Sequence, residues 1–190
     1  MFDSLKCAID NITQEGPVLE LGVHEGTTLA QITKYCHEKD IKDIHGFDCW
    51  TGLPEAWLDK DGQVVGRGVQ GRFATNGPPN IPGVRYWNGL FDDTLPDFLS
   101  EISPKQFSFV NIDCDLYSST VDILKHIGHL FAKGTVIRLD DWFYKHSLQH
   151  KEGEQKAFLE WCEEKNVNYR QLYYQVNSKQ DEESTVLIIG

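Results

Sequence analysis

The chain has 190 residues, 40% of them hydrophobic and 25% charged, a composition typical of a globular domain whose core needs no disulfides. Its net charge of -11 and its pI near 5.0 argue against broad nucleic-acid binding and against docking on an anionic membrane. The five cysteines include no Cys-x-x-Cys pair, and neither a secretory signal nor a membrane-spanning apolar run is visible, so we expect a reduced, soluble, cytoplasmic protein.

The first elements in the chain are predicted to be a helix, a strand and a turn that contains glycine. Apolar residues at helical spacing place a helix within residues 1–15, and Gly16-Pro17 ends it. A short apolar strand follows at 17–22, and the turn 23–26 leads into a second helix. Strand, glycine turn and helix in this order bring backbone atoms close to a nucleotide-like ligand.

The residues of this turn favour one cofactor over others. The turn lacks the full G-x-G-x-x-G spacing, which weakens a nicotinamide or flavin interpretation. Glu20 would repel a pyrophosphate but suits the amino group and positive sulfur of S-adenosylmethionine. A plain strand-to-helix turn explains Gly22 and Gly26 equally well. Asp48, which ends the next predicted strand about twenty residues later, is placed to accept hydrogen bonds from ribose hydroxyls and favours the cofactor.

The segment from 51 to 82 is rich in glycine and proline and has no sustained period. A loop of this length in a small domain is usually functional, so we predict a lid or substrate loop, with one helical turn at 53–58. Trp50, Trp57 and Trp142 would be either an apolar wall for an acceptor or anchors of loops. His146 and His150 lie in a polar loop near the same edge and would be surface residues or reach the site; Trp87 and Trp161 are assigned to the core.

The remaining elements alternate between strand and helix, without a repeat or a domain boundary. Alternation of this kind predicts one domain, 1–190, with a mostly parallel sheet that a pair of strands completes. The predicted elements are a strand at 84–87, a helix from 92, a strand at 109–112, a helix after 120, a strand at 134–139, a helix at 154–165, and strands at 169–175 and 185–189.

Four acids follow two of these strands. Asp113 and Asp115 come after one buried strand, and Asp140 and Asp141 come after the next. The carboxyl ends of neighbouring parallel strands meet at one edge of the sheet, so three or four carboxylates would surround one point. Only a bound cation would offset the repulsion between them. Oxygen ligands indicate Mg²⁺, or Mn²⁺ or Ca²⁺, rather than zinc. Each acid alone is more often structural, solvating a strand end or capping a turn.

Several segments occur together in a distinctive order. They are Leu19-Glu20-Leu21-Gly22-Val23-x-x-Gly26, Gly46-Phe47-Asp48-x-x-x-Gly52-Leu53-Pro54-Glu55, Gly89-x-Phe91-x-Asp93-Thr94-Leu95-Pro96, Asn111-Ile112-Asp113-Cys114-Asp115-Leu116-Tyr117-Ser118-Ser119-Thr120 and Gly134-Thr135-Val136-Ile137-x-x-Asp140-Asp141. As a set, from about Val18 to Phe158, they resemble the macrocin O-methyltransferase (TylF-like) family.

This resemblance implies a class I S-adenosylmethionine-dependent methyltransferase. The expected fold is Rossmann-like α/β, with a seven-stranded, mostly parallel sheet, an antiparallel last strand and helices on both faces. The implied activity is Mg²⁺-dependent O-methylation of a hydroxyl on a sugar or natural-product-like small molecule. Members of the family carry amino-terminal lid segments, whereas one short helix precedes the first strand here, so covering the acceptor falls to 51–82, the loop after Asp141 or a partner subunit.

The resemblance also implies roles for individual residues. Asp115 is expected to be the general base. Asp113 is expected to be both a catalytic and a cofactor-binding residue. The cofactor-binding residues are Glu20, Gly22, Gly26, Asp48 and Asp113, and the metal ligands are Asp113, Asp140 and Asp141.

The resulting hypothesis is that Mg²⁺ or Mn²⁺ orients the acceptor hydroxyl and lowers its pKa, while Asp115 takes the proton. Two alternatives stay open. Asp113-x-Asp115 also matches the D-x-D metal motif of nucleotide-sugar glycosyltransferases, which would leave Glu20, Gly22 and Asp48 without a role. A methyltransferase-like domain that binds the cofactor without catalysis is the second alternative. We expect a small-molecule acceptor as partner, neither nucleic acid nor membrane, and keep a homodimer as an option.

Overall fold

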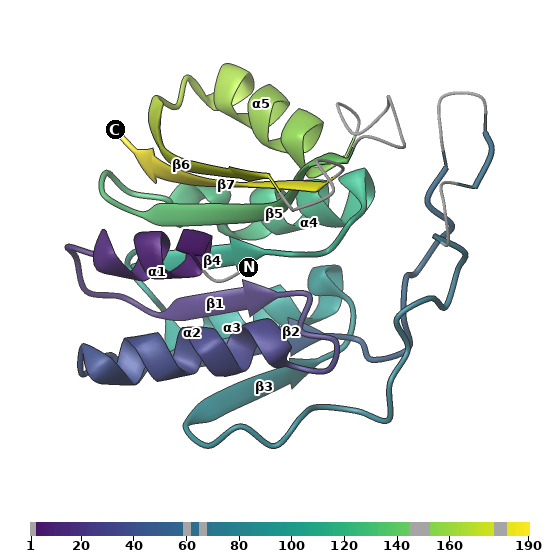
Figure 1. The fold of residues 1–190 in the computed structure, drawn as a ribbon, viewed down its shortest axis with the longest axis horizontal. Coiled ribbons are helices and arrows are strands. Elements are labelled where there is room, and N and C mark those ends of the chain that lie inside the picture. The colour runs from purple at the N-terminus through teal and green to yellow at the C-terminus, as the bar shows by residue number, and fades with distance from the viewer. Residues whose placement is uncertain (1–2, 59–61, 65–67, 145–152, 177–181) are drawn as a thin grey trace.

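A computed structural model describes residues 3–58, 62–64, 68–144, 153–176 and 182–190. Within them, seven strands form one sheet (Figure 1). In chain order they are β1 (Val18–Leu21), β2 (Ile44–Asp48), β3 (Val84–Asn88), β4 (Phe109–Ile112), β5 (Val136–Tyr144), β6 (Tyr169–Val176) and β7 (Glu182–Ile189).

The order of strands across the sheet is β3-β2-β1-β4-β5-β7-β6, from bottom to top in Figure 1. Strands β1 to β5 pair in parallel, and β7 pairs antiparallel with both β5 and β6. The sheet thus has a single antiparallel strand, the last in the chain, and the predicted Rossmann-like methyltransferase fold is confirmed.

Helices cover both faces of the sheet. On one face lie α1 (Asp3–Asp10) and α2 (Thr27–Glu38), which Figure 1 shows in front, and their apolar residues share a core with Val18, Ile44 and Phe109. On the other face lie α3 (Phe91–Ile102), α4 (Tyr117–Ile127) and α5 (Glu154–Lys165), with the short 3-10 helix η1 (Gly128–Leu130) after α4. Because both faces are covered, the central strands β1 and β4 are buried at every residue, as parallel strands usually are.

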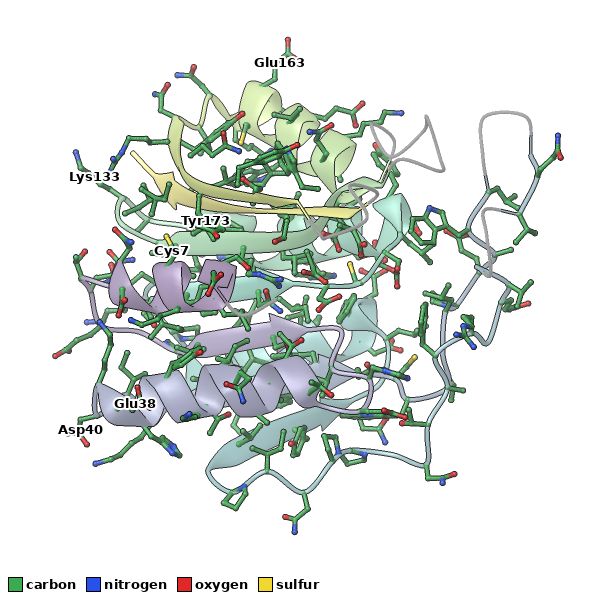
Figure 2. All side chains as sticks on the ribbon, in the orientation of Figure 1. Cys7, Glu38, Asp40, Lys133, Glu163 and Tyr173 are labelled. Carbon is green, nitrogen blue, oxygen red and sulfur yellow. The ribbon has the colours of Figure 1, made fainter. Side chains whose placement is uncertain are left out.

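Many charged side chains lie on the surface of the molecule. Figure 2 shows Glu38, Asp40, Lys133 and Glu163 pointing away from the body of the protein, and all four are exposed. Within the described part of the chain, no helix is long and apolar enough to cross a membrane.

Strand β5 differs from its prediction. The sequence places its end at Leu139, before the two acids, but the strand continues to Tyr144. Its pairing with β7 shifts register between Leu139 and Phe143, so an irregularity of the β-bulge kind lies at the acids. Leu139 pairs with Ile112, the last residue of β4, so β5 extends beyond β4 and pairs there with β7 alone.

The long segment between β2 and β3 also differs from its prediction. Residues 53–58 form no helical turn; Leu58 instead pairs with Val64 in an isolated antiparallel bridge. Two arms of the segment are tied by backbone hydrogen bonds, from Leu53 N–H to Arg72 C=O (2.8 Å) and from Gly71 N–H to Leu53 C=O (2.9 Å). Figure 1 shows the segment extending away from the sheet edge. Backbone pairing between the arms satisfies donors that the predicted helical turn would have used.

Candidate active site

A cavity of about 1020 Å³ lies at the carboxyl ends of the central strands. Residues that follow β1, β2 and β4 line it, together with residues of β5 and of the segment 51–82. The site residues predicted from the sequence that line this cavity are Gly22, Gly26, Asp48, Asp113, Asp115, Asp140 and Asp141. Glu20 is not among the lining residues.

The turn after β1 forms one wall of the cavity and is held by Asp48. One carboxylate oxygen of Asp48 accepts the N–H groups of Val23 (2.9 Å) and His24 (2.7 Å), and the other accepts that of Trp50 (2.7 Å). The carboxylate therefore ties the turn to the end of β2 while still facing the cavity. Each carboxylate oxygen has two lone-pair sites, so the oxygen that accepts only the Trp50 N–H retains capacity for a further hydrogen bond.

Gly22 is required by the close approach of β1 and β4. Its φ of +98° lies in the left-handed region, and a Cβ there would overlap the carbonyl oxygen of Asp113. Gly26, with φ of +80°, precedes α2, and a Cβ on it would meet the Pro79 side chain at 2.5 Å. Both glycines thus serve close contacts within the chain that bring the turn after β1 beside β4 and the segment 51–82.

Glu20 lies inside the sheet, beneath the cavity. Its side chain is fully buried, one oxygen accepts the Asn111 amide N–H (2.9 Å), and the other has no partner among the described residues. Burial raises the pKa of Glu20 well above its usual value, although Asn111 and the charge of Arg138 act in the opposite direction. Glu20 therefore links β1 to Asn111 of β4 and does not itself line the cavity.

Asp115 occupies a tight turn directly after β4. Its φ is +64°, and the Leu116 N–H donates to the Cys114 carbonyl across it (2.7 Å). A left-handed conformation at a residue with a side chain costs on the order of 1 to 3 kcal/mol and is found at functional sites. Burial, and then the negative charge of Asp140, raise the pKa of Asp115 to about 7. A carboxyl group with such a pKa exchanges protons near neutral pH.

Asp113 and Asp141 share the acidic side of the cavity with Asp115. Burial, followed by the charge of Asp140, raises the pKa of Asp113 well above its usual value. Burial, followed by the charges of Asp115 and Glu154, does the same for the pKa of Asp141. Neither side chain is paired with a cation in the described structure, whereas Asp140 forms an ion pair with Arg138.

The predicted metal ligands are neighbours but are not arranged around one point. Within the described residues, no group of three or more His, Cys, Asp or Glu side chains is placed to hold a metal ion. Arg138 holds Asp140 from one side and donates to Asn111 (2.8 Å) and Ser4 (3.0 Å) on the other. The donor atoms suit a hard cation, but as placed they do not fit one.

Glu154, the first residue of α5, belongs to the site and is missed by the sequence analysis. Its carboxylate is fully buried and accepts the backbone N–H groups of Cys114 (2.9 Å) and Asp141 (3.2 Å). Burial outweighs these hydrogen bonds and raises the pKa of Glu154 to about 8. An acid in the first turn of a helix is common, so the sequence alone gives no signal that this one is buried.

The segment 51–82 contributes to the opposite side of the cavity. Phe73 lines it and makes an edge contact with the His24 ring, with centroids 5.5 Å apart. Glu55 lines it as well and accepts a hydrogen bond from Ser118 at the start of α4. The segment therefore borders both the turn after β1 and the acidic side of the cavity.

Trp50 and Trp142 serve as buried anchors and do not form an apolar wall of the cavity. Trp50 and Trp142 are buried in the two cores and do not line the cavity, and Trp50 donates its indole N–H to the His24 carbonyl (3.2 Å). Trp87 and Trp161 are core residues, as predicted. His146 and His150 lie outside the described residues.

The strand order with β7 antiparallel, the glycine turn after β1 and the acid after β2 define a class I methyltransferase architecture. The sequence agrees with the structure: it matches the family described as Methyltransferase domain over residues 19–142. The chain therefore belongs to this family of methyltransferase domains, whose members use S-adenosylmethionine. No curated protein matches it in a sequence comparison.

Solved structures share the fold at low sequence identity. The calicheamicin methyltransferase CalS11 is 21% identical, with a TM-score of 0.71 over 97% of this chain and 75% of that one. The O-methyltransferase NovP is 17% identical, with a TM-score of 0.70 over 98% of this chain and 78% of that one. The fibrillarin pre-rRNA processing protein of Methanococcus jannaschii is 12% identical, with a TM-score of 0.54 over 94% and 68%. These similarities establish the fold alone.

Proposed function

We propose that the protein transfers a methyl group from S-adenosylmethionine to a hydroxyl oxygen of a sugar or related small molecule. The observation that carries this proposal is the position of Asp115. Its carboxyl group lines the same cavity as the cofactor turn, and its pKa of about 7 suits a base that works near neutral pH.

The turn Gly22–Gly26 and Asp48 are the residues that would hold the cofactor. Residues of the turn line the cavity, and Asp48 fixes its conformation while offering one oxygen to a ribose hydroxyl. Acidic side chains elsewhere in the cavity suit a positively charged ligand. Bound S-adenosylmethionine supplies an electrophilic methyl group on a positive sulfur.

Asp115, as a carboxylate, would accept the proton of the acceptor hydroxyl. Its strained turn presents the side chain at the end of β4, beside the cofactor turn that Gly22 brings close. Loss of the proton leaves an oxygen nucleophile facing a cationic donor, and holding the two in line accounts for much of the rate. Asp113 and Asp141, which line the cavity beside Asp115, would orient the acceptor by hydrogen bonds.

A sugar acceptor is suggested by the relatives in fold. One of them is described as a TDP-rhamnose 3'-O-methyltransferase. The volume of about 1020 Å³ has room for a cofactor and a monosaccharide, because ligand pockets commonly measure about 300 to 1,000 Å³. The D-x-D glycosyltransferase alternative gives Asp48 no role, and a purely cofactor-binding domain gives none to Asp115.

Assistance by Mg²⁺ or Mn²⁺ bound to Asp113, Asp140 and Asp141 stays a finer prediction. All three carboxyl groups line the cavity, but Asp140 would have to leave Arg138 to take part. Turnover with added Mg²⁺, compared with turnover in excess chelator, tests this prediction. Activity that chelator abolishes and Mg²⁺ restores would support it.

The experiment for the main proposal is a transfer assay with isotopically labelled S-adenosylmethionine and a panel of sugars and nucleotide sugars. We expect label on a hydroxyl oxygen of at least one acceptor, located by mass spectrometry. Asp115→Asn should lower kcat by about 10² to 10⁴-fold, the usual contribution of a positioned base. Asp97→Asn, on the exposed side of α3, is the matched control and should be fully active. Full activity of Asp115→Asn would contradict the assigned role.

A further inference from the structure

Glu154 joins two segments of the site that are distant in sequence. Its Oε1 accepts the Cys114 N–H at 2.9 Å, and its Oε2 accepts the Asp141 N–H at 3.2 Å. Cys114 lies between Asp113 and Asp115 at the end of β4, and Asp141 lies on β5. The carboxyl group of Glu154 therefore fixes the end of β4 relative to the end of β5.

The contact at Cys114 also supports the strained turn of Asp115. The N–H of Cys114 is held by Glu154, and its carbonyl accepts the Leu116 N–H at 2.7 Å, so both backbone groups before Asp115 are fixed. The φ of +64° at Asp115 persists only if its surroundings determine it. Glu154 is one of the groups that do so.

Attachment of α5 to the sheet does not require this carboxylate. The helix buries Ala157, Phe158, Trp161 and Cys162 in the core shared with β5 and α4, and these contacts anchor it. A carboxyl group buried to 0% exposure is costly where an apolar residue would serve packing alone. Its presence calls for a role in fixing the strand ends.

We propose that Glu154 is a positioning residue for methyl transfer, which clamps the ends of β4 and β5 and so aims Asp115 at the acceptor hydroxyl. This inference rests on the proposed function. Glu154 would act through Asp115 and touch neither cofactor nor acceptor, since it does not line the cavity.

The first test is Glu154→Gln, with Glu163→Gln as matched control on the exposed side of the same helix (Figure 2). The glutamine keeps the length but can offer an oxygen to only one of the two N–H groups. We expect faster hydrogen exchange at the Cys114 and Asp141 amides and a kcat lower by about 10 to 100-fold. KM for the acceptor and Kd for S-adenosylhomocysteine should stay within about twofold of wild type, and Glu163→Gln should match wild type throughout.

The second test is a double-mutant cycle with Asp115→Asn. If Glu154 acts through Asp115, adding Glu154→Gln to Asp115→Asn should change kcat by less than about twofold. Multiplicative losses would overturn the proposal, as would unchanged exchange at both amides. If Glu154→Gln does not fold, Glu154→Asp, which is too short to reach both N–H groups, is measured in its place with the same expectations. Absence of methyl transfer by wild type would refute the proposed function, while the exchange data would still decide whether the clamp exists.

Discussion

The backbone conformations of Gly22 and Asp115 position the groups that line the cavity. Gly22 lets β1 approach the carbonyl of Asp113, and Asp115 turns sharply away from β4. Asp48, which the sequence indicated as a ribose acid, has an additional structural task, because it accepts three backbone N–H groups around the cofactor turn. At this scale Gly22, Asp48 and Asp115 all act through the backbone around the cavity.

Gly22→Ala tests the close approach of β1 and β4. We expect a loss of about 3 kcal/mol or more in the free energy of unfolding, because the new Cβ would overlap the Asp113 carbonyl in addition to straining the backbone. Gly77→Ala is the matched control, since Gly77 has a φ of +113° but nothing within 4 Å of its Cβ position. It should lose only about 1 to 2 kcal/mol, the cost of the left-handed conformation. Urea denaturation of both variants decides the matter, and equal losses would contradict the account.

The sequence located most of this site because its signals are local. Strands that end in acids and a glycine turn after an apolar strand are visible in a short window, and they identified Gly22, Asp48 and Asp115. Burial of Glu20, the Arg138–Asp140 ion pair and the Glu154 clamp depend on pairing between distant strands and on helix placement. No local pattern carries that information.

At the scale of elements, the ends of β4 and β5 act as one unit. Leu139 pairs with Ile112, so Asp113 and Asp140 follow side by side, and Glu154 at the start of α5 spans the pair. The sequence predicted both strands and the fold class, but not the continuation of β5 past its acids. The irregular register with β7 that permits this continuation arises only in the assembled sheet.

The shared burial of acids in this unit predicts a dependence of stability on pH. The pKa is raised to about 7 for Asp115 and to about 8 for Glu154, whereas both groups titrate near 4 in an unfolded chain. The folded state therefore binds these protons more tightly. Their contribution to stability is complete below about pH 4 and is lost as the pH rises toward 7 and 8.

The free energy of unfolding should accordingly fall between about pH 5 and pH 8, by up to about 1.4 kcal/mol per pH unit for each group. Urea denaturation in chelator at several pH values measures this slope. Glu154→Gln removes one of the titrations and should give a shallower slope than wild type. A wild-type stability that rises over this range would be inconsistent with buried, protonated acids.

For the whole molecule, function follows from the order of strands. The order in which the chain adds strands reverses at β1 and β4: β2 and β3 lie on one side of β1, and the chain then returns to place β4 on its other side. Gly22 and Asp113 follow these two strands. Ligands of open α/β sheets bind at this point, outside the carboxyl ends of the strands. The cavity occupies it, with the cofactor turn on one side and the acids on the other, and the segment 51–82 contributes Glu55 and Phe73 to its lining.

The most direct test of this account is calorimetric titration of the protein with S-adenosylhomocysteine, in Mg²⁺ and in chelator. We predict saturable binding of one ligand per chain with a Kd in the micromolar range, about -8 kcal/mol, in both conditions, because Gly22, Gly26 and Asp48 are not predicted metal ligands and only Asp113 is predicted to serve both. Absence of binding in both conditions at millimolar ligand would contradict the assignment of the cavity as a cofactor site.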